Sequence, residues 1–300
     1  MNIDMVMLVA IGLLTGATTV LFGFGGGFVA VPVVVWADAA LGTDAIRVAT
    51  ATSALVMLVN AAFATAVTPR RDLLALRGTG PLLPLLATGA ILGAAAARFA
   101  PPTLARWAFV AYIALTALDL LLRPGFLRNG PVDADADVDG GRATGPHGSV
   151  GAPARPAKAD TSRPLPAATG LPIGAVAAFL GVGGSVMTVP AMRRAGHTMR
   201  RATALANPLT LAIALPAALV SLAGSPPLDT TAPHPDLVGL VDPYAAAALL
   251  LGALPVIALL RRRPPRIPDR THAWSYIGLL TTVALAMLLS DPSSHTSLTG

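Results

Sequence analysis

The sequence predicts an all-α, polytopic membrane protein with about eight transmembrane segments, arranged as two four-helix repeats. Apolar residues make up 54% of the 300 residues and charged residues only 12%, and the mean hydropathy is +0.68. Apolar windows long enough to span a bilayer as helices recur along the chain. A glycine-rich interruption of such a window occurs once in each half. The first helix of each repeat is therefore expected to be broken.

The eight apolar segments cover approximately residues 5–35, 48–68, 80–98, 104–122, 167–192, 203–223, 243–260 and 273–290. The first segment is interrupted by Gly23-Phe24-Gly25-Gly26-Gly27, and the fifth by Gly181-Val182-Gly183-Gly184-Ser185. Each glycine costs about 1 kcal/mol relative to alanine inside a helix, so neither stretch favours a continuous helix. At membrane depth, a broken backbone survives only where it is buried in protein or lines a cavity.

The two interruptions align at a constant offset of 158 residues, which also relates Pro32 to Pro190. Further matches follow in the same order: residues 47–51 with 200–204, Gly89 with Gly252, and Trp107 with Trp274. An internal duplication explains this order. We expect a first transmembrane repeat over residues 1–123, a disordered linker over 124–165, a second repeat over 166–290 and a tail over 291–300.

Small residues recur at four-residue spacing in the third segment, at Gly89, Gly93 and Ala97. Such residues let helix backbones approach closely in a membrane, so they predict a packing face. In the second repeat the position that matches Gly93 is Val256, so this face is not fully duplicated.

The placement of arginines predicts the orientation, because positive loops stay in the cytoplasm. If each segment spans once, the arginine-rich loops after segments five and seven lie inside and both termini lie outside. Arg70, Arg71 and Arg77 then fall on the wrong side. Either their loop is an exception, or an interrupted segment re-enters and changes the count.

Several function classes lose support from the composition. The chain has no cysteine, which excludes disulfides and thiolate chemistry. Asp119 is the one acid well inside an apolar segment; it is expected to pair with Arg123 at a helix end, the alternative being a proton-coupling acid. The histidines all fall in loops or the tail, at positions 147, 197, 234, 272 and 295. We expect no enzyme, no metal, no cofactor and no nucleic-acid partner.

The remaining binding groups belong to the backbone. A helix broken at glycines exposes N–H groups at the start of its second part, where anions bind. Two such breaks in related halves could meet near the midplane and hold one small anion. The alternative is that the glycines only permit tight helix crossing, and that nearby polar groups only join helices. The candidate substrate-binding residues are Gly25, Gly26, Gly27, Pro32, Thr50, Thr52, Ser53, Gly183, Gly184, Ser185, Pro190 and Asn207.

The first interruption, with Pro32 after it and then Ala49-Thr50-Ala51-Thr52-Ser53, resembles the sulfite exporter TauE/SafE family, also called the 4-toluene sulfonate uptake permease family. The resemblance covers residues 5–123 and 166–290. The second motif departs from the pattern, because Ser185 replaces the third glycine and Leu205-Ala206-Asn207-Pro208 replaces the Thr-Ser stretch. The resemblance implies passage of sulfur-containing anions, such as sulfite, sulfonates or sulfoacetate, across the plasma membrane.

Together these features predict a secondary transporter for a small, sulfur-containing anion, multi-pass in the plasma membrane and without ATP machinery. The expected partners are the small anionic substrate and the lipid bilayer, with H⁺ or Na⁺ as a possible coupling ion. The direction of transport and the oligomeric state are left open. The alternative function is a non-transport polytopic membrane protein, either a structural partner of another membrane complex or a lipid-modifying enzyme.

Overall fold

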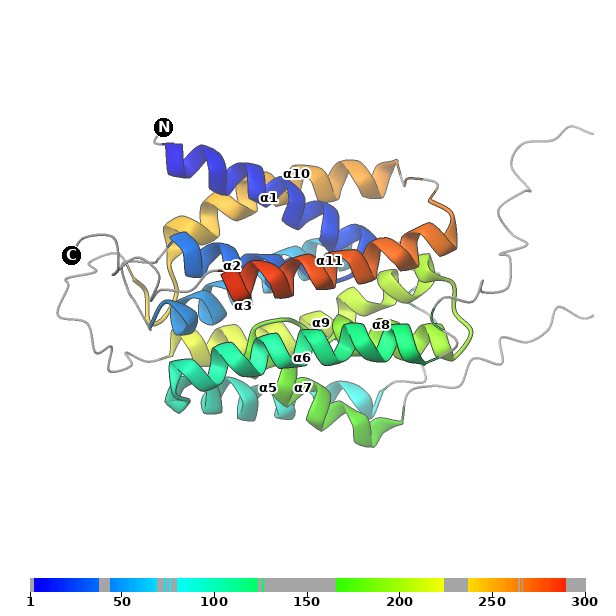
Figure 1. Ribbon diagram of the computed structural model, residues 1–300, viewed down its shortest axis with the longest axis horizontal. Helices are drawn as coiled ribbons and strands as arrows, with labels where there is room; N and C mark the ends of the chain where they lie inside the picture. Colours follow the sequence, from blue (N-terminus) through cyan, green and yellow to red (C-terminus); the bar gives the residue numbers. More distant parts are fainter. Residues whose placement is uncertain are drawn as a thin grey trace, which may run out of the picture.

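The computed structural model describes residues 3–37, 44–68, 80–123, 166–223, 237–263 and 267–289, and the single residues 73, 76, 126 and 265. Seven helices are long and apolar enough to cross a membrane, so the chain is a polytopic, all-helical membrane protein (Figure 1). These are α1 (Ile3–Phe22), α3 (Ala45–Ala66), α5 (Leu82–Phe99), α6 (Pro102–Leu122), α9 (Met199–Leu222), α10 (Pro243–Arg262) and α11 (Asp269–Leu289).

The two interrupted segments each contain a short helix after the break. The first consists of α1 and α2 (Gly27–Ala37). The second consists of the single turn η3 (Ala167–Thr169), α7 (Gly170–Leu180) and α8 (Ser185–Arg194). The expected break in the first helix of each half is therefore confirmed.

Helix ends gather at two opposite faces of the bundle. At one face, Arg47 donates to the carbonyl of Ala100 (3.0 Å) and Arg98 to that of Val220 (3.2 Å), which joins the start of α3 to the ends of α5 and α9. Arg106 at the start of α6 donates to the carbonyl of Met287 near the end of α11. We call this the N-terminal face, because α1 also begins there (Figure 1).

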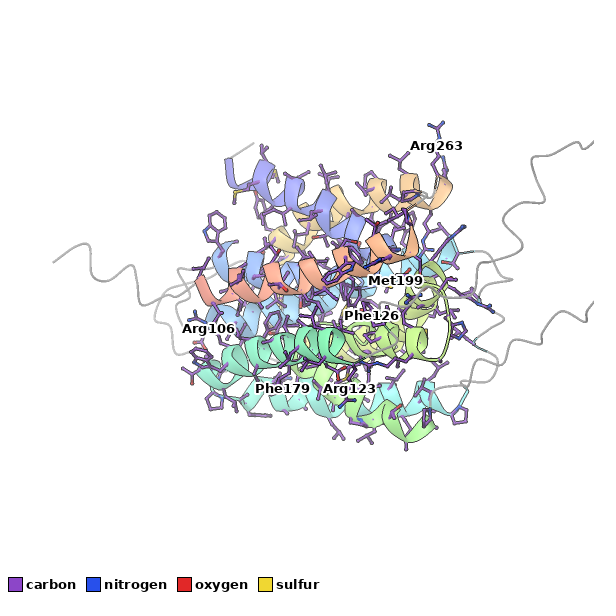
Figure 2. The ribbon with its side chains drawn as sticks, turned by 45° about the vertical axis from the view of Figure 1, so that its right-hand side comes forward. Arg106, Arg123, Phe126, Phe179, Met199 and Arg263 are labelled. Carbon is purple, nitrogen blue, oxygen red and sulfur yellow. The ribbon has the colours of Figure 1, made fainter. Side chains whose placement is uncertain are left out.

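The opposite face is held by ion pairs. Arg194 at the end of α8 contacts Asp119 near the end of α6 (2.5 Å), and Arg193 contacts Asp269 at the start of α11 (2.6 Å). We call it the basic face; Arg263 and Met199 lie toward it, and Arg106 lies at the other end of the bundle (Figure 2). Its described arginines are Arg123, Arg193, Arg194, Arg200, Arg201, Arg261, Arg262, Arg263 and Arg270.

The first interrupted segment begins and ends at the N-terminal face. α1 runs parallel to α10, because Gly12 faces Leu249 and Gly16 faces Ala253. It therefore starts where α10 starts and approaches the basic face. After the break, α2 runs back toward the start of α3 (Figure 1).

The second interrupted segment does the same from the basic face. α7 runs parallel to α5, because Gly170 faces Leu82 and Gly174 faces Leu86. After the break, α8 returns to the basic face, where it ends at Arg194 beside Asp119.

These returns resolve the orientation problem posed by Arg70, Arg71 and Arg77. The chain between the end of α3 and the start of α5 joins two helix ends at the basic face, although the three arginines themselves lie outside the described residues. Of the two explanations for these arginines, the second is therefore supported: each interrupted segment returns to the face from which it came, so it does not count as one span. The connection between α6 and α7 also leaves and rejoins the protein at the basic face.

The two halves interlock. α1 of the first half packs along α10 of the second, and α7 of the second packs along α5 of the first. The contacts are glycine-mediated: a β-carbon built on Gly89 or Gly93 would collide with the α7 backbone. The packing face predicted in the third segment is thereby confirmed, and its partner is a helix of the other half.

The division into two repeats stays a prediction, which the packing supports. Gly12 and Gly16 match Gly170 and Gly174 at the 158-residue offset. Both pairs lie in the equivalent crossing, α1 on α10 and α7 on α5. The expected linker and tail lie outside the described residues, except for Phe126. Phe126 is fully buried and packs against Tyr276 (ring centroids 5.5 Å apart).

Candidate functional site

The backbone at the two breaks takes conformations that favour glycine. Gly23, Gly25 and Gly26 have positive φ angles in the first break, and Gly181 and Gly183 in the second. A left-handed conformation costs a residue with a β-carbon about 1–2 kcal/mol, whereas glycine adopts it freely. The glycines are thus required by the turns themselves, in addition to any packing.

The two breaks touch each other near the centre of the bundle. A β-carbon built on Gly27 would lie 2.8 Å from the carbonyl oxygen of Gly181, and one built on Gly183 would lie 3.3 Å from the carbonyl oxygen of Phe24. Met57 of α3 lies against Gly25, Gly27 and Gly183. The two breaks therefore lie in contact, as expected.

The polar groups around the first break centre on Asn60 of α3. This residue is fully buried, and neither atom of its amide has a hydrogen-bond partner within the described part of the chain. The amide nitrogen lies 2.7 Å from the position of a β-carbon on Gly26, directly before α2. Thr15 and Thr19 of α1 lie around the same point.

The second break has a different set of neighbours. Gly184 faces Ile213, which occupies the position that matches Asn60. The hydroxyl of Ser185, in the first turn of α8, is fully buried and has no partner among the described residues, and neither has that of Thr188 one turn later. The buried polar side chains without partners among the described residues therefore include Asn60 of α3 at the first break, and Ser185 and Thr188 of the short helix itself at the second.

Two hydroxyl residues of α3 border the second break. Ser53 donates to the carbonyl of Gly181 (3.1 Å), and Thr50 lies beside the same glycine. The hydroxyl of Thr50 donates to the carbonyl of Ile46 in its own helix (2.8 Å). Both residues are thus close enough to the breaks to belong to one site.

The other predicted residues lie farther along the helices. Thr52 accepts a hydrogen bond from the backbone N–H of Asp242 (2.9 Å), which anchors the start of α10. Pro32 and Pro190 are buried inside α2 and α8. Asn207 is fully buried in α9; its amide nitrogen donates to Thr203 (3.4 Å), and its oxygen has no partner among the described residues.

Aromatic side chains join the two breaks. Tyr276 of α11 packs its ring on Phe24 of the first break (centroids 5.0 Å apart) and donates its hydroxyl to the carbonyl of Ser185 in the second (3.2 Å). Phe24 stacks in turn on Phe28 of α2 (4.8 Å). These contacts keep the centre closed by packed rings.

The residues of this centre that sequence reasoning missed include Asn60, Tyr276, Met57 and Thr210, the last of which packs against Gly25. A polar or aromatic residue in the middle of an apolar segment is a usable signal for the first two. Met57 and Thr210 occupy matching positions in α3 and α9, but nothing in their residue types indicates a site.

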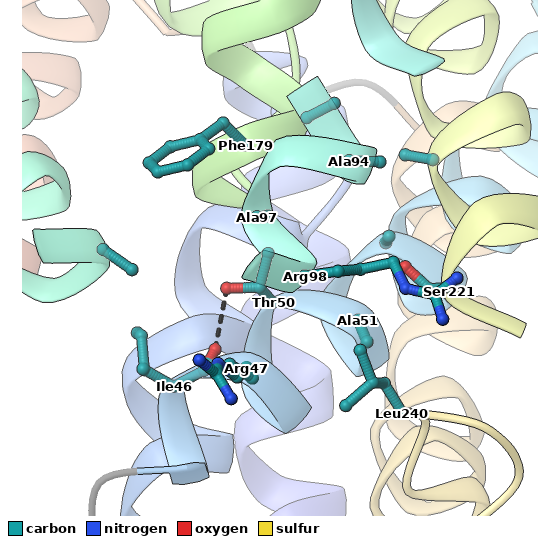
Figure 3. Close-up of a pocket in the computed structure, with 14 residues that line it drawn as sticks. Ile46, Arg47, Thr50, Ala51, Ala94, Ala97, Arg98, Phe179, Ser221 and Leu240 are labelled. Atoms are coloured by element: carbon teal, nitrogen blue, oxygen red, sulfur yellow. Dashed lines mark hydrogen bonds between the residues drawn. The ribbon is translucent and has the colours of Figure 1, made fainter. Parts of the chain in front are cut away.

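A cavity of about 20 Å³ lies between the centre and the N-terminal face (Figure 3). Two of its lining residues carry charge, Arg47 at the start of α3 and Arg98 at the end of α5. Thr50 also lines it, so its inner end borders the second break. The remaining lining residues are Ile46, Ala51, Ala54, Ala94, Ala97, Ala105, Ala178, Phe179, Ala217, Ser221 and Leu240.

Two further titratable residues lie toward the basic face. Asp119 pairs with Arg123 (2.7 Å), which confirms the expected helix-end pair, and it also contacts Arg194 of α8. His272 lies in the first turn of α11, buried against the carbonyl of Leu21, and not in a loop as expected. α11 begins earlier than the apolar run indicates, because Asp269 supplies an acid to its first turn.

No group of three or more potential metal ligands occurs among the described residues. No curated protein and no solved structure matches the chain. A family model described as Sulfite exporter TauE/SafE matches residues 8–287, which is nearly the whole chain. Because this family consists of membrane transporters, the match argues against the alternative function, a non-transport structural partner or a lipid-modifying enzyme. With its two glycine-broken segments meeting at the centre of a helical membrane bundle, the chain belongs to the TauE/SafE sulfite exporter family of membrane transporters.

Proposed function

We propose that this transporter moves a small sulfur-containing oxyanion, such as sulfite or a sulfonate, across the plasma membrane by secondary transport. The anion binds where the two glycine breaks meet, beside Asn60. The observation that carries this proposal is the fully buried amide of Asn60, which has no partner in the described chain and faces the start of α2. An unsatisfied buried group of this kind costs about 1–3 kcal/mol, so a ligand that bonds to it gains that energy.

The donors at this point suit an oxyanion. The short helices α2 and α8 begin at the breaks. From their third residues, Val29 and Met187, the N–H groups donate to the carbonyls of Gly26 and Gly184, so the N–H groups of the first two residues of each helix are the ones not used within the helix. Each helix start carries about half a positive charge, which favours an anion without a cationic side chain. The amide nitrogen of Asn60 adds two further N–H donors.

The arrangement of the breaks suits alternating access. Each interrupted segment forms a hairpin of two helices. The first hairpin, α1 and α2, enters from the N-terminal face, and the second, α7 and α8, enters from the basic face. The two hairpins meet at the glycine breaks. Movement of either hairpin relative to α3 and α9 would open that point toward its own face. By the positive-inside rule, the basic face lies in the cytoplasm and both termini lie outside.

The test is Asn60→Leu, a replacement of similar volume. If the amide serves the ligand, the variant loses binding while the ligand-free protein is as stable as the wild type or more so, because an unpaired buried amide is removed. The measurements are thermal stabilisation of the purified protein by sulfite and by methanesulfonate, and anion flux in proteoliposomes. We expect affinity to fall about ten- to a hundred-fold, the equivalent of about 1.5–3 kcal/mol.

Thr116→Val is the control, because its hydroxyl donates within α6, to the carbonyl of Tyr112. Unchanged affinity in Asn60→Leu would remove the central site. If neither sulfite nor methanesulfonate stabilises the wild type, the assignment to sulfur oxyanions is contradicted.

A further inference from the structure

We propose that the cavity at the N-terminal face is a second anion site, a vestibule in which Arg47 and Arg98 hold the oxyanion before it reaches the glycine breaks. This inference rests on the proposed function, because it describes the route to that binding point. The ligand class is the same, a small oxyanion with several acceptor oxygens.

The two charged residues that line the cavity are arginines, and the buried carboxylate of Asp44, which pairs with Arg47, does not line it. Arg47 and Arg98 are its only charged lining residues within the described part of the chain. Arg47 is fixed by Asp44 (3.2 Å) and by the carbonyl of Ala100 (3.0 Å), yet its buried Nε has no partner among the described residues. Within the described residues, Arg98 is oriented by a bond to the carbonyl of Val220 (3.2 Å). Both guanidinium groups therefore keep N–H donors for an anion.

The cavity leads toward the breaks. Thr50 lines it, and the α-carbon of Thr50 lies 3.2 Å from the position of a β-carbon on Gly181. Ala178 and Phe179, in the last turn of α7 before the same break, line it as well. Thr50 therefore lies between the cavity and the second break.

In the second half, larger side chains occupy the position that corresponds to this cavity. Arg47 and Arg98 correspond to Arg200 and Arg261 near the basic face, at offsets of 153 and 163 residues. Four alanines of the cavity have larger counterparts, whereas Ala51 and Ala217 match the alanines Ala204 and Ala64. Ala54, Ala94, Ala97 and Ala105 correspond to Asn207, Ile257, Leu260 and His272, respectively.

Three of the four larger residues, Asn207, Ile257 and His272, are buried. The asymmetry of the two vestibules therefore follows from side-chain volume: small residues leave space beneath the arginines of the N-terminal face, and large ones occupy it beneath those of the basic face. In this conformation the space available to an anion therefore lies on the side of the N-terminal face.

Single cysteines can test the vestibule, because the chain has none of its own. Ala97→Cys places a thiol in the cavity wall, and Leu260→Cys places one at the filled counterpart. Each purified variant is treated with a methanethiosulfonate reagent that carries a sulfonate and with one that carries a trimethylammonium group. Both rates are divided by the rate with a free thiol in solution.

We expect the normalised rate at Ala97→Cys to favour the anionic reagent about tenfold at low ionic strength, since a cleft lined by one sign of charge concentrates the opposite ion. Salt should reduce the preference. Methanesulfonate, which does not react with thiols, should slow the reaction. Leu260→Cys should react slowly with both reagents.

Arg98→Gln, added to Ala97→Cys, should bring the ratio of the two rates close to one, and Arg98→Lys should retain most of the preference. Arg106→Gln is the matched control, because Arg106 lies at the same face but does not line the cavity. A ratio near one before any arginine is changed, or a preference that survives Arg98→Gln, would overturn the vestibule. Thiol reactivity needs no transport, so this result stands apart from the Asn60→Leu test: either proposal can fail while the other holds.

Discussion

At the scale of single residues, the two breaks are built from different glycines. The first has positive φ angles at Gly25 and Gly26, so its turn cannot be made easily by other residues. In the second break, Gly184 precedes α8 with a φ of −75°, an ordinary right-handed conformation. Gly26 and Gly184 therefore match in the sequence, but only Gly26 has a backbone conformation that favours glycine.

Gly26→Ala and Gly184→Ala should consequently differ. A methyl group on Gly26 meets Thr15 and Asn60 and forces a left-handed residue to carry a β-carbon, at about 1–2 kcal/mol for the backbone alone. A methyl group on Gly184 meets only the end of the Ile213 side chain (2.5 Å), which can move. We expect Gly26→Ala to weaken anion binding at least tenfold and Gly184→Ala to bind nearly as the wild type does.

The measurement is anion-dependent thermal stabilisation of each purified variant, together with the melting temperature without anion. Equal losses of affinity in both variants would mean that the two breaks contribute alike. Unchanged affinity in Gly26→Ala would mean that the start of α2 does not contact the anion.

At the scale of elements, the ends of the two short helices α2 and α8 are held in different ways. α8 ends in Arg193 and Arg194, which bind Asp269 and Asp119, and the side chain of Arg193 is only 1% exposed. Arg193 also donates to the carbonyl of Phe126 (2.9 Å). The matching end of α2 carries Val35 and Trp36, which cannot form ion pairs. The end of α2 therefore lacks the ion pairs that anchor the end of α8.

Glycine crossings hold the two long helix pairs, and they give a prediction about stability alone. Gly93→Ala should destabilise the protein by about 1–3 kcal/mol, because its β-carbon would collide with the backbone of Ala175 in α7. Gly278→Ala is the control, since a β-carbon there has no neighbour within 4 Å. Folded protein that survives Gly93→Ala should bind the anion with unchanged affinity.

The readouts are the melting temperature and the yield of monodisperse protein. Normal stability in Gly93→Ala would show that α5 and α7 can separate without cost. A loss of affinity at normal stability would assign the glycine to binding.

At the scale of the whole molecule, the sequence was sufficient for the class of protein and for the two breaks, because glycine runs are incompatible with continuous helix. It did not decide whether an interrupted segment spans or returns, since both need the same apolar residues. It also did not reveal the interlocking of the halves: Gly12 and Gly93 indicate close packing but not the partner helix. Asn60 was missed because its match in the second half is Ile213, so the repeat gave no signal.

The topology predicts that the connection between the halves can be shortened. Deleting residues 132–162 should leave membrane insertion and anion flux nearly intact, because α6 ends and α7 begins at the same face. The deletion spares Phe126, whose buried ring packs on Tyr276 and whose carbonyl accepts from Arg193. Phe126→Ala in the shortened chain should cost about 3–5 kcal/mol of stability. Flux per molecule in proteoliposomes and the melting temperature separate the two effects; lost flux at normal stability after the deletion alone would show that residues 132–162 take part in transport.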